Sequence, residues 1–522
     1  MKINNPLFMA DMPDPDVLRV GDAFYLVSTT MFYMPAVPIL KSNDLQHWHI
    51  VSYVCSQIED NDTYHLRNDR HAYGKGQWAT SLMQYKGRFY ACFVCHDMGN
   101  TYLFSTDDIE KSDWDRVELP AVYHDMSFLC FEDKVYLVYG NGDIRIVELK
   151  EDFSGTVEGS DRLLFTAPKE GIRLRCEGCR AYVRDGEIYL LFIEWPVDTP
   201  EKRGIRREVC YRLQDLSGAY ERRIILEDDG EITGCGIAQG PLFDDAEGNW
   251  YAMLFQDCGA VGRIPFLMPV AWKDGWPVPG IDGKAPKDFE VPLAEKIIED
   301  VIQSDSFNHR ENRLSRVWQW NHAPNNEAWS FTKRPGFLRL ESRGLVQELF
   351  EAENTLTQRT RAPYSAFTVK LSCGGMKDGD YAGLCVMLEK YGQIGVRQRN
   401  GVKELVLRCR DGERAPYDVV CREGILGLKS WYSIKEQTVS LSEDTVWLKV
   451  AFDFGDWGKG EEQALFSYSL DGKNYRSMGE GLSMFFSLSL FVGARIGIFS
   501  YNEENEVGGY TDFCDFTYSS QR

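Results

Sequence analysis

The chain has 522 residues, of which 43% are hydrophobic and 13% aromatic. At about 100–200 residues per domain, this length predicts two domains with full hydrophobic cores. The formal net charge of −21 would repel phosphate backbones and anionic lipids, so we exclude nucleic-acid and membrane partners.

The N-terminal residues MKINNPLFMADMPDPDVLRV contain no apolar run of signal-peptide length. We therefore expect a cytoplasmic location. Cysteines are scattered, and Cys176 and Cys179 have the spacing of a redox or zinc motif. Without a signal peptide to indicate an oxidising compartment, we interpret them as buried, reduced thiols.

Apolar and polar residues alternate with a period of two through most of the chain, which predicts an all-β protein. One pattern recurs five times: a key residue, an apolar strand, a turn with Gly or Asp, and a second strand with a central aromatic. The copies are roughly 45 to 65 residues apart, the length of a four-stranded propeller blade. They begin at Asp14, Trp78, Asp125, Glu177 and Ala238. The repeat predicts a five-bladed β-propeller over residues 1–297.

No further copy of the repeat follows residue 297. The later segments GFLRLES, YAGLCVMLE, TVWLKVAFDF and ALFSYSLDG have strand character. They predict a second domain, an antiparallel β-sandwich over residues 298–522.

Three of the five repeats open with a carboxylate, namely Asp14, Asp125 and Glu177. In a propeller the innermost strand of each blade lines the axis, so equivalent positions converge on one funnel. Three converging carboxylates repel one another, which is costly unless the shifted proton affinities serve a function. The alternative is that each one caps a strand end or a turn. Their shared register favours a common site.

Glycoside cleavage requires one acid that protonates the leaving oxygen and one carboxylate that acts on the anomeric carbon or on water. A third carboxylate can raise the pKa of the acid by like-charge proximity. The sequence shows no Ser-His-Asp arrangement, P-loop or dinucleotide-binding glycine pattern. The three carboxylates therefore indicate a glycosidase, with a non-catalytic sugar-binding propeller as the alternative of a different class.

In these segments the sequence resembles glycoside hydrolase family 43. The resemblance rests on NPLFMADMPDPDVLRVGDAFYLVSTT, GQWATSLMQYKGRFY, YHDMSFL, RCEGCRAY and GIAQGPLFDDAEGNWYAMLFQDCGAVGRIPFLMPV, in this order. The later segments DSFNHRENRLSRVWQWNHAPNNEAWSFTKRPGFLRL and GGYTDFCDF look like the concanavalin-like, jelly-roll domain of family β-xylosidases. An invertase-like family shares the architecture and retains configuration, but its Trp-Met-Asn-Asp-Pro and Arg-Asp-Pro motifs are absent here.

The resemblance implies a role for each matching residue. Asp14 of the opening Pro-Asp-Pro would be the general base, and Glu177 the general acid. Asp125 would be the residue that modulates the pKa of the acid. Arg263 would contact sugar hydroxyls, and Trp78 would lie near the sugar pocket.

The same resemblance assigns Gln239 and Phe32 to substrate binding. Three positions depart from the family pattern. Relatives often carry His where this chain has Phe32, Ala238 and Cys258. These differences leave the three carboxylates unchanged. They put in doubt whether a metal ion binds at the propeller axis and which sugar the site prefers.

The implied activity is inverting, exo-acting release of D-xylose from the non-reducing ends of β-1,4-xylo-oligosaccharides, with α-L-arabinofuranosidase side activity. A primarily arabinofuranosidase enzyme is the near alternative. The expected partners are xylo- or arabinoxylo-oligosaccharides. The sequence does not decide whether the chain forms a homo-oligomer. No cofactor is required, but a structural calcium could bind in the sandwich with Asp305 and Asp515 as ligands.

Two geometric expectations follow for the site. A loop of the sandwich around Met484, Phe485 and Phe486 should wall one side of the pocket, by similarity to relatives. Asp14 and Glu177 open blades one and four, so they should face one another across the axis. That placement favours the longer carboxyl separation that inverting enzymes use.

Overall fold

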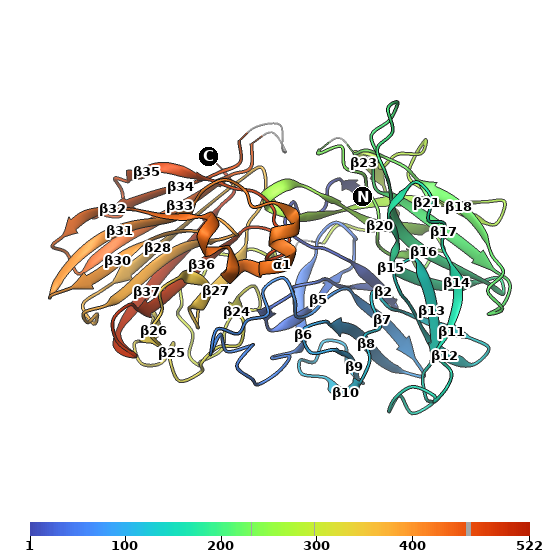
Figure 1. Cartoon of the computed structure of the whole chain (residues 1–522), viewed down its shortest axis with the longest axis horizontal. Helices are drawn as coiled ribbons and strands as arrows, with labels where there is room; N and C mark the ends of the chain where they lie inside the picture. The colour runs from blue at the N-terminus through green and yellow to red at the C-terminus, as the bar shows by residue number, and fades with distance from the viewer. Residues whose placement is uncertain (231, 297, 456–460, 522) are drawn as a thin grey trace.

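The computed structural model describes residues 1–230, 232–296, 298–455 and 461–521. Figure 1 shows two β-domains side by side, a propeller formed by the N-terminal half and a sandwich formed by the C-terminal half. Within the described ranges there is one α-helix, α1 (Tyr417–Gly427), and no helix there is long and apolar enough to cross a membrane. The predicted all-β architecture is confirmed.

The propeller has five blades, each a four-stranded antiparallel sheet. In chain order, the strands of the blades are β2 (Asp16–Val20), β3 (Ala23–Val27), β5 (Ala36–Ser42) and β6 (His49–Cys55); β7 (Thr80–Tyr85), β8 (Arg88–Cys95), β9 (Asn100–Thr106) and β10 (Asp115–Leu119); β11 (Ser127–Phe131), β12 (Lys134–Tyr139), β13 (Asp143–Glu148) and β14 (Arg162–Thr166); β15 (Ile172–Arg184), β16 (Glu187–Pro196), β17 (Arg207–Leu213) and β18 (Glu221–Leu226); β19 (Leu242–Asp244), β20 (Trp250–Asp257), β21 (Arg263–Lys273) and β22 (Trp276–Pro279).

Tight turns set the register of several hairpins. Lys86-Gly87 joins β7 to β8, and Asp185-Gly186 joins β15 to β16. The φ angles of these four residues are 48°, 81°, 52° and 82°. Two successive positive φ angles are the signature of the two-residue turn that matches the twist of an antiparallel pair. The Gly and Asp turn signals in the sequence therefore mark the hairpins of the blades.

The first strands of the blades surround the axis. Strand β2 contacts β7, β7 contacts β11, and β11 contacts β15, while β19 returns to β2 and closes the ring. Each repeat begins just before one of these inner strands, except the fourth, which begins at Glu177 within β15. An N-terminal strand, β1 (Lys2–Asn4), pairs with β23 (Asp288–Glu290) beyond blade five and ties the two ends of the propeller together.

The sandwich consists of one eight-stranded and one seven-stranded antiparallel sheet. In spatial order, the sheets are β32 (Ser433–Leu441), β31 (Val402–Asp411), β30 (Gly392–Arg399), β29 (Asp380–Met387), β36 (Arg495–Asn502), β27 (Leu356–Arg359), β24 (Gln319–Asn321) and β4 (Tyr33–Met34); and β25 (Trp329–Ser330), β26 (Leu338–Arg343), β37 (Val507–Ser519), β28 (Tyr364–Ser372), β33 (Thr445–Asp453), β34 (Gln463–Ser469) and β35 (Arg476–Ser483).

The two domains share a continuous interior. Strand β4 leaves blade one and completes the larger sandwich sheet, where Met34 pairs with Trp320. The Arg495 guanidinium of the sandwich lies 3.9 Å from the centre of the Tyr33 ring. Residue 297, the predicted end of the propeller, lies outside the described residues, so the boundary at 297/298 stays a prediction. The shared strand and the shared core hold the sandwich against the propeller.

Candidate functional site

Turns before the inner strands place Asp14 and Asp125 near the propeller axis. Asp14 lies just before β2 and Asp125 just before β11, whereas Glu177 lies within β15. The φ angles of Asp14 and Asp125 are 51° and 49°. Non-glycine residues rarely adopt this left-handed conformation, which costs about 1–3 kcal/mol and tends to persist at functional sites. Both aspartates are buried.

A chain of contacts joins the three carboxylates. Asp14 Oδ1 accepts a hydrogen bond from Gln239 Nε2 at 3.1 Å. The Gln239 side chain lies against Gly178, where an added Cβ would come within 2.4 Å of Gln239 Cδ. The Gly178 N–H donates to Asp125 Oδ2 at 2.9 Å, and Glu177 is the residue before Gly178. The structure thus brings the predicted carboxylates and Gln239 into one cluster.

An ion pair orients Asp14. Arg263 Nη1 lies 3.0 Å from Asp14 Oδ1 and 3.2 Å from Oδ2, and both side chains are buried. The backbone N–H of Arg263 donates to Asp11 Oδ1 at 2.8 Å. Buried charge-assisted bonds of this kind fix geometry as well as charge. Arg263 therefore contacts the predicted base directly.

Glu177 is held from two sides. Asn141 Nδ2 donates to Glu177 Oε2 at 2.6 Å, and His124 Nε2 lies 3.4 Å from the same oxygen. His124 Nε2 is also 3.7 Å from Asp125 Oδ2. Asp125, and then Glu177, raise the pKa of His124 to about 9, so the imidazole is a cation at neutral pH. The acid and its predicted modulator are thus bridged by a positive charge.

A second imidazole, that of His96, contacts His124. His96 Nε2 lies 3.1 Å from His124 Nδ1. Burial, and then the charge of His124, lower the pKa of His96, so His96 is the neutral member of the pair. Because a cationic His124 has N–H groups on both nitrogens, it can donate to His96 and to the carboxylates at once.

Trp78 forms one wall of the cluster. Its ring lies edge-on to His96 with centroids 4.7 Å apart, and it is 5.6 Å from the ring of Phe491. The buried Gln77 donates to the Trp78 carbonyl at 2.7 Å and fixes the backbone there. Trp78 is partly exposed, so part of its ring is free to face a ligand.

The sandwich extends this wall through the loop between β35 and β36. The Arg263 guanidinium lies 4.5 Å from the Phe491 ring centre, and its Nη2 donates to the Phe491 carbonyl at 3.3 Å. Phe486 packs edge-on against Phe491 at 6.1 Å. The Gly493 N–H donates to the buried Asp11 at 2.9 Å. The predicted loop therefore reaches the site, and Phe491 is its contact residue.

The comparisons with known proteins agree with this geometry. Residues 3–277 match the model of glycosyl hydrolases family 43, and residues 304–519 match the β-xylosidase C-terminal concanavalin A-like domain. The chain belongs to glycosyl hydrolase family 43.

Several relatives carry names that fit the family. A β-xylosidase of Formosa agariphila is 27% identical and covers 98% of this chain and 90% of that protein. A non-reducing end α-L-arabinofuranosidase of Bacteroides ovatus is 24% identical over 80% of each chain. The solved structure of a bifunctional GH43-CE protein from Bacteroides eggerthii superposes with a TM-score of 0.90 at 38% identity over 100% of this chain. This chain spans 64% of that larger protein's length.

Family 43 membership makes the chain a glycosidase with a carbohydrate substrate. Cys176 and Cys179 flank the acid, and both are free and buried. Burial raises the pKa of Cys176 to about 12, so it is an unreactive thiol at neutral pH.

Phe32, which was predicted to bind substrate, is buried in the structure. Its side chain is 0% exposed and stacks on His322 with centroids 5.0 Å apart, edge-on to Tyr73 at 4.7 Å. A ring without exposed surface has no face for a sugar in this conformation. The geometry gives Phe32 a packing role between the propeller and the sandwich, where it supports the loop that leads to Trp78.

An arginine occupies the axis next to the carboxylates. Arg180 is buried, and its Nη2 lies 2.9–3.4 Å from the carbonyl oxygens of Asp14, Pro15 and Thr80. Carbonyl oxygens around a propeller axis are ligands for a hard cation. Here a guanidinium supplies the positive charge, while Ala238 offers no imidazole. These residues do not fit an axial metal ion.

The predicted calcium ligands, Asp305 and Asp515, do not form a calcium site. The Asp305 carboxylate accepts from the Phe307 N–H at 2.8 Å, from Trp318 Nε1 at 3.0 Å, and pairs with His309 Nε2 at 2.9 Å. Asp515 is exposed. Calcium prefers six to eight oxygen ligands, whereas Asp305 is surrounded by nitrogen donors. This donor set does not fit a calcium ion, and family 43 catalysis needs no cofactor.

Within the described part of the chain, one group has a spacing compatible with a metal ion, namely His124, Asp125 and Glu177. Glu177 is the predicted general acid, and its Oε2 already accepts a hydrogen bond from Asn141. We therefore expect this group to serve acid–base chemistry.

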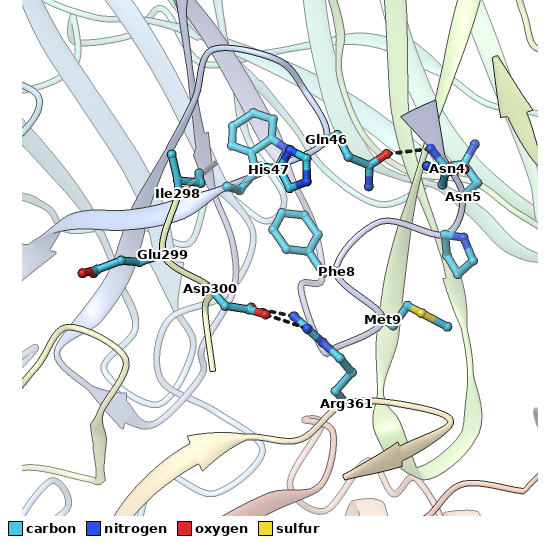
Figure 2. A pocket seen from close by; sticks show the side chains of 12 residues that line it. Asn4, Asn5, Phe8, Met9, Gln46, His47, Ile298, Glu299, Asp300 and Arg361 are labelled. Carbon is cyan, nitrogen blue, oxygen red and sulfur yellow. Dashed lines mark hydrogen bonds and ion pairs between the residues drawn. The ribbon is translucent and has the colours of Figure 1, made fainter. Parts of the chain in front are cut away.

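A separate hollow of about 350 Å³ lies at the junction of the N-terminal segment, blade one and the linker to the sandwich (Figure 2). An ion pair between Asp300 and Arg361, with both contacts at 2.6 Å, borders it on one side. The Phe8 ring lies across its centre. Asp14, Asp125 and Glu177 do not line it, so it is separate from the carboxylate cluster.

Four residues of the site were not predicted from the sequence, namely His96, His124, Asn141 and Phe491. His124 stands directly before Asp125 in the motif YHDMSFL, which was the one available signal. The other three come from loops whose approach to the site depends on the path of the chain between strands. No spacing rule in the sequence places them there.

The charge of His124 predicts a shift in the pH profile. In His124→Phe the positive charge beside Glu177 is lost, which disfavours an ionised carboxyl at that position. The basic limb of kcat/KM against pH should therefore move upward. The measurement is a pH–rate profile on an aryl pentoside. His96→Phe, which removes a neutral imidazole, serves as the matched control, and a limb that stays in place or moves downward in His124→Phe contradicts this account.

Proposed function

We propose that this family 43 enzyme is an inverting, exo-acting glycosidase that releases D-xylose from the non-reducing ends of β-1,4-xylo-oligosaccharides, with α-L-arabinofuranosidase side activity. The observation that supports it most is a wall of three packed side chains beside the carboxylates. In this wall, Phe491 of the sandwich packs on both Trp78 and Arg263 of the propeller.

The wall supports exo action. A bare propeller presents a shallow funnel, which suits binding anywhere along a polysaccharide. The loop carrying Phe491 covers one side of this funnel and is pinned through Gly493 to Asp11 and through Ala494 to the carbonyl of Ala260. A site closed on one side accepts a chain end, so a single terminal sugar fits beside the carboxylates.

The contacts support two distinct carboxylate roles. Glu177, held by Asn141 and His124, would donate its proton to the glycosidic oxygen. Asp14, held by Arg263 and Gln239, would accept a proton from the attacking water. Each turnover then forms the bond between water oxygen and the anomeric carbon and breaks the glycosidic bond, with one proton gained by Asp14 and one lost from Glu177.

The position of Gln239 supports inversion. Inverting enzymes leave about 6.5–9.5 Å between the two carboxyl groups to admit a water, whereas retaining enzymes hold them about 5–5.5 Å apart. The Gln239 side chain lies between Asp14 and Gly178, the neighbour of Glu177. A residue inserted between base and acid favours the longer separation.

The choice of sugar rests on the named relatives, one a β-xylosidase and one an α-L-arabinofuranosidase. The two pentoses present similar reacting groups, and differences of pocket shape change selectivity by about 10–200-fold per missing or extra group. A primarily arabinofuranosidase enzyme is therefore the second candidate.

Product analysis tests the proposal. Xylotriose should give xylose and xylobiose from the first time point, and the viscosity of long xylan should not fall. In a panel of aryl glycosides, the β-xyloside should be cleaved faster than the α-L-arabinofuranoside. The reverse order would favour the second candidate, and early release of mixed internal fragments from xylan would refute exo action.

A further inference from the structure

Gln239 lies in a β-bulge at the start of blade five. Ala238 pairs with Phe255, and Leu242 pairs with Ala252. Between these two pairs the chain has three residues on the side of Gln239 and two on the opposite side, so one extra residue is inserted there. The φ angle of Gln239 is 64°, in the left-handed region. A bulge of this kind redirects a side chain and takes a backbone N–H out of the hydrogen-bond ladder of the sheet.

The backbone N–H that the bulge frees is bound by a side chain of the neighbouring blade. Glu208, on β17 of blade four, accepts the Gln239 N–H with Oε2 at 2.7 Å. The Glu208 side chain is 0% exposed, and its other oxygen, Oε1, has no hydrogen-bond partner among the described residues. Because a buried backbone N–H without a partner costs free energy, the Glu208 carboxyl stabilises the bulged backbone of Gln239.

A carboxyl group at this place is costly for the fold. The residues that pair with Glu208 in the sheet, Ile193 and Leu226, are apolar and buried. Burial raises the pKa of Glu208 to about 8, so its carboxyl group is largely protonated at neutral pH. An apolar side chain could fill the same space without the cost of removing a carboxyl from water. The bond to Gln239 is therefore the contact that explains a polar residue here.

The side chain of Gln239 carries this contact on to the carboxylate cluster. Its Nε2 donates to Asp14 Oδ1 at 3.1 Å, and its Cδ lies against Gly178, the residue after Glu177. The Gln239 side chain is buried, so it has little room to adjust if its backbone moves. Two hydrogen bonds therefore join the interior of blade four to the predicted base, one on each side of Gln239.

We propose that Glu208 is a positioning residue of this enzyme, which holds the backbone of Gln239 in the bulge so that the Gln239 side chain keeps its hydrogen bond to Asp14. The inference rests on the proposed function, in which Asp14 is the general base. A side chain without exposed surface cannot contact a sugar, so Glu208 acts only through Gln239.

Removal of the acceptor tests this role. Glu208→Met fills a similar volume without an oxygen acceptor, so kcat/KM on an aryl xyloside should fall about 10–100-fold, the effect of one lost hydrogen bond to a charged group. Glu208→Gln keeps an oxygen for the Gln239 N–H and should recover most of this loss. Gln239→Leu should lose about as much as Glu208→Met, and the double variant should lose no more than Gln239→Leu alone, because both changes remove the same interaction.

Cys210→Ala is the matched control, because Cys210 is a buried residue of the same strand. It should leave kcat/KM unchanged. Wild-type kcat/KM in Glu208→Met, or in Glu208→Leu if Glu208→Met does not fold, would overturn the positioning role. So would an equal loss in Glu208→Gln or Cys210→Ala, or losses that multiply in the double variant. A wild-type chain that cleaves no glycoside of the panel would refute the proposed function first, and the positioning role with it.

Discussion

Glu177→Gln should lower kcat on xylobiose by about 10²–10⁴-fold, the contribution typical of a positioned general acid. Glutamine keeps the shape of the side chain and can still meet Asn141 and His124, so the loss reports the missing proton. A sugar is a poor leaving group and depends on protonation. An activated aryl xyloside does not, so its loss should be much smaller. The measurement is kcat for both substrates.

The control for this prediction is Glu158→Gln, an exposed glutamate of blade three outside the site. It should leave kcat unchanged on both substrates. An equal loss on xylobiose and on the aryl xyloside would show that Glu177 does not act as the proton donor to the leaving oxygen.

Asp14→Asn should reduce kcat/KM by about 10²–10⁴-fold on both substrates, because the attacking water then has no base. Unlike the loss at Glu177, this loss should not depend on the leaving group. The contrast between the two variants therefore identifies acid and base separately. Steady-state kinetics on xylobiose and the aryl xyloside measure it.

The Asp14 variant also affects stability, since it leaves Arg263 as a buried cation without its carboxylate partner. Removing one partner of a buried pair costs about 3–5 kcal/mol. Thermal unfolding must accompany the kinetics, with Asp22→Asn, an exposed aspartate of blade one, as control. A folded Asp14→Asn protein with near wild-type kcat/KM would remove Asp14 from the chemistry.

The sequence allowed the propeller and the carboxylate cluster to be predicted because both depend on register. The repeat places Asp14, Asp125 and Glu177 at corresponding positions, and the inner strands β2, β11 and β15 carry them to one cluster. Gln239 follows Ala238, where the fifth repeat begins, but it was the resemblance to the family that assigned it to the site. Positions within a strict repeat are determined locally, so a pattern along the chain is sufficient.

The rest of the site depends on contacts that no local pattern encodes. His124 lies beside Asp125 in the sequence, yet its bridge to Glu177 depends on the direction of a side chain. Phe491 comes from the second domain, so its approach depends on how the sandwich docks. That docking in turn uses β4, two residues of blade one that pair with β24 across a long separation in sequence.

The central claim is that Asp14 acts through a water while Glu177 protonates the leaving oxygen. Proton NMR of the first sugar released from a β-xyloside tests it most directly, because attack by water on the face opposite the leaving group inverts the anomeric carbon. The account predicts α-xylose as the first product, followed by slow mutarotation. Release of β-xylose first, or a covalent sugar trapped on Asp14, would contradict it.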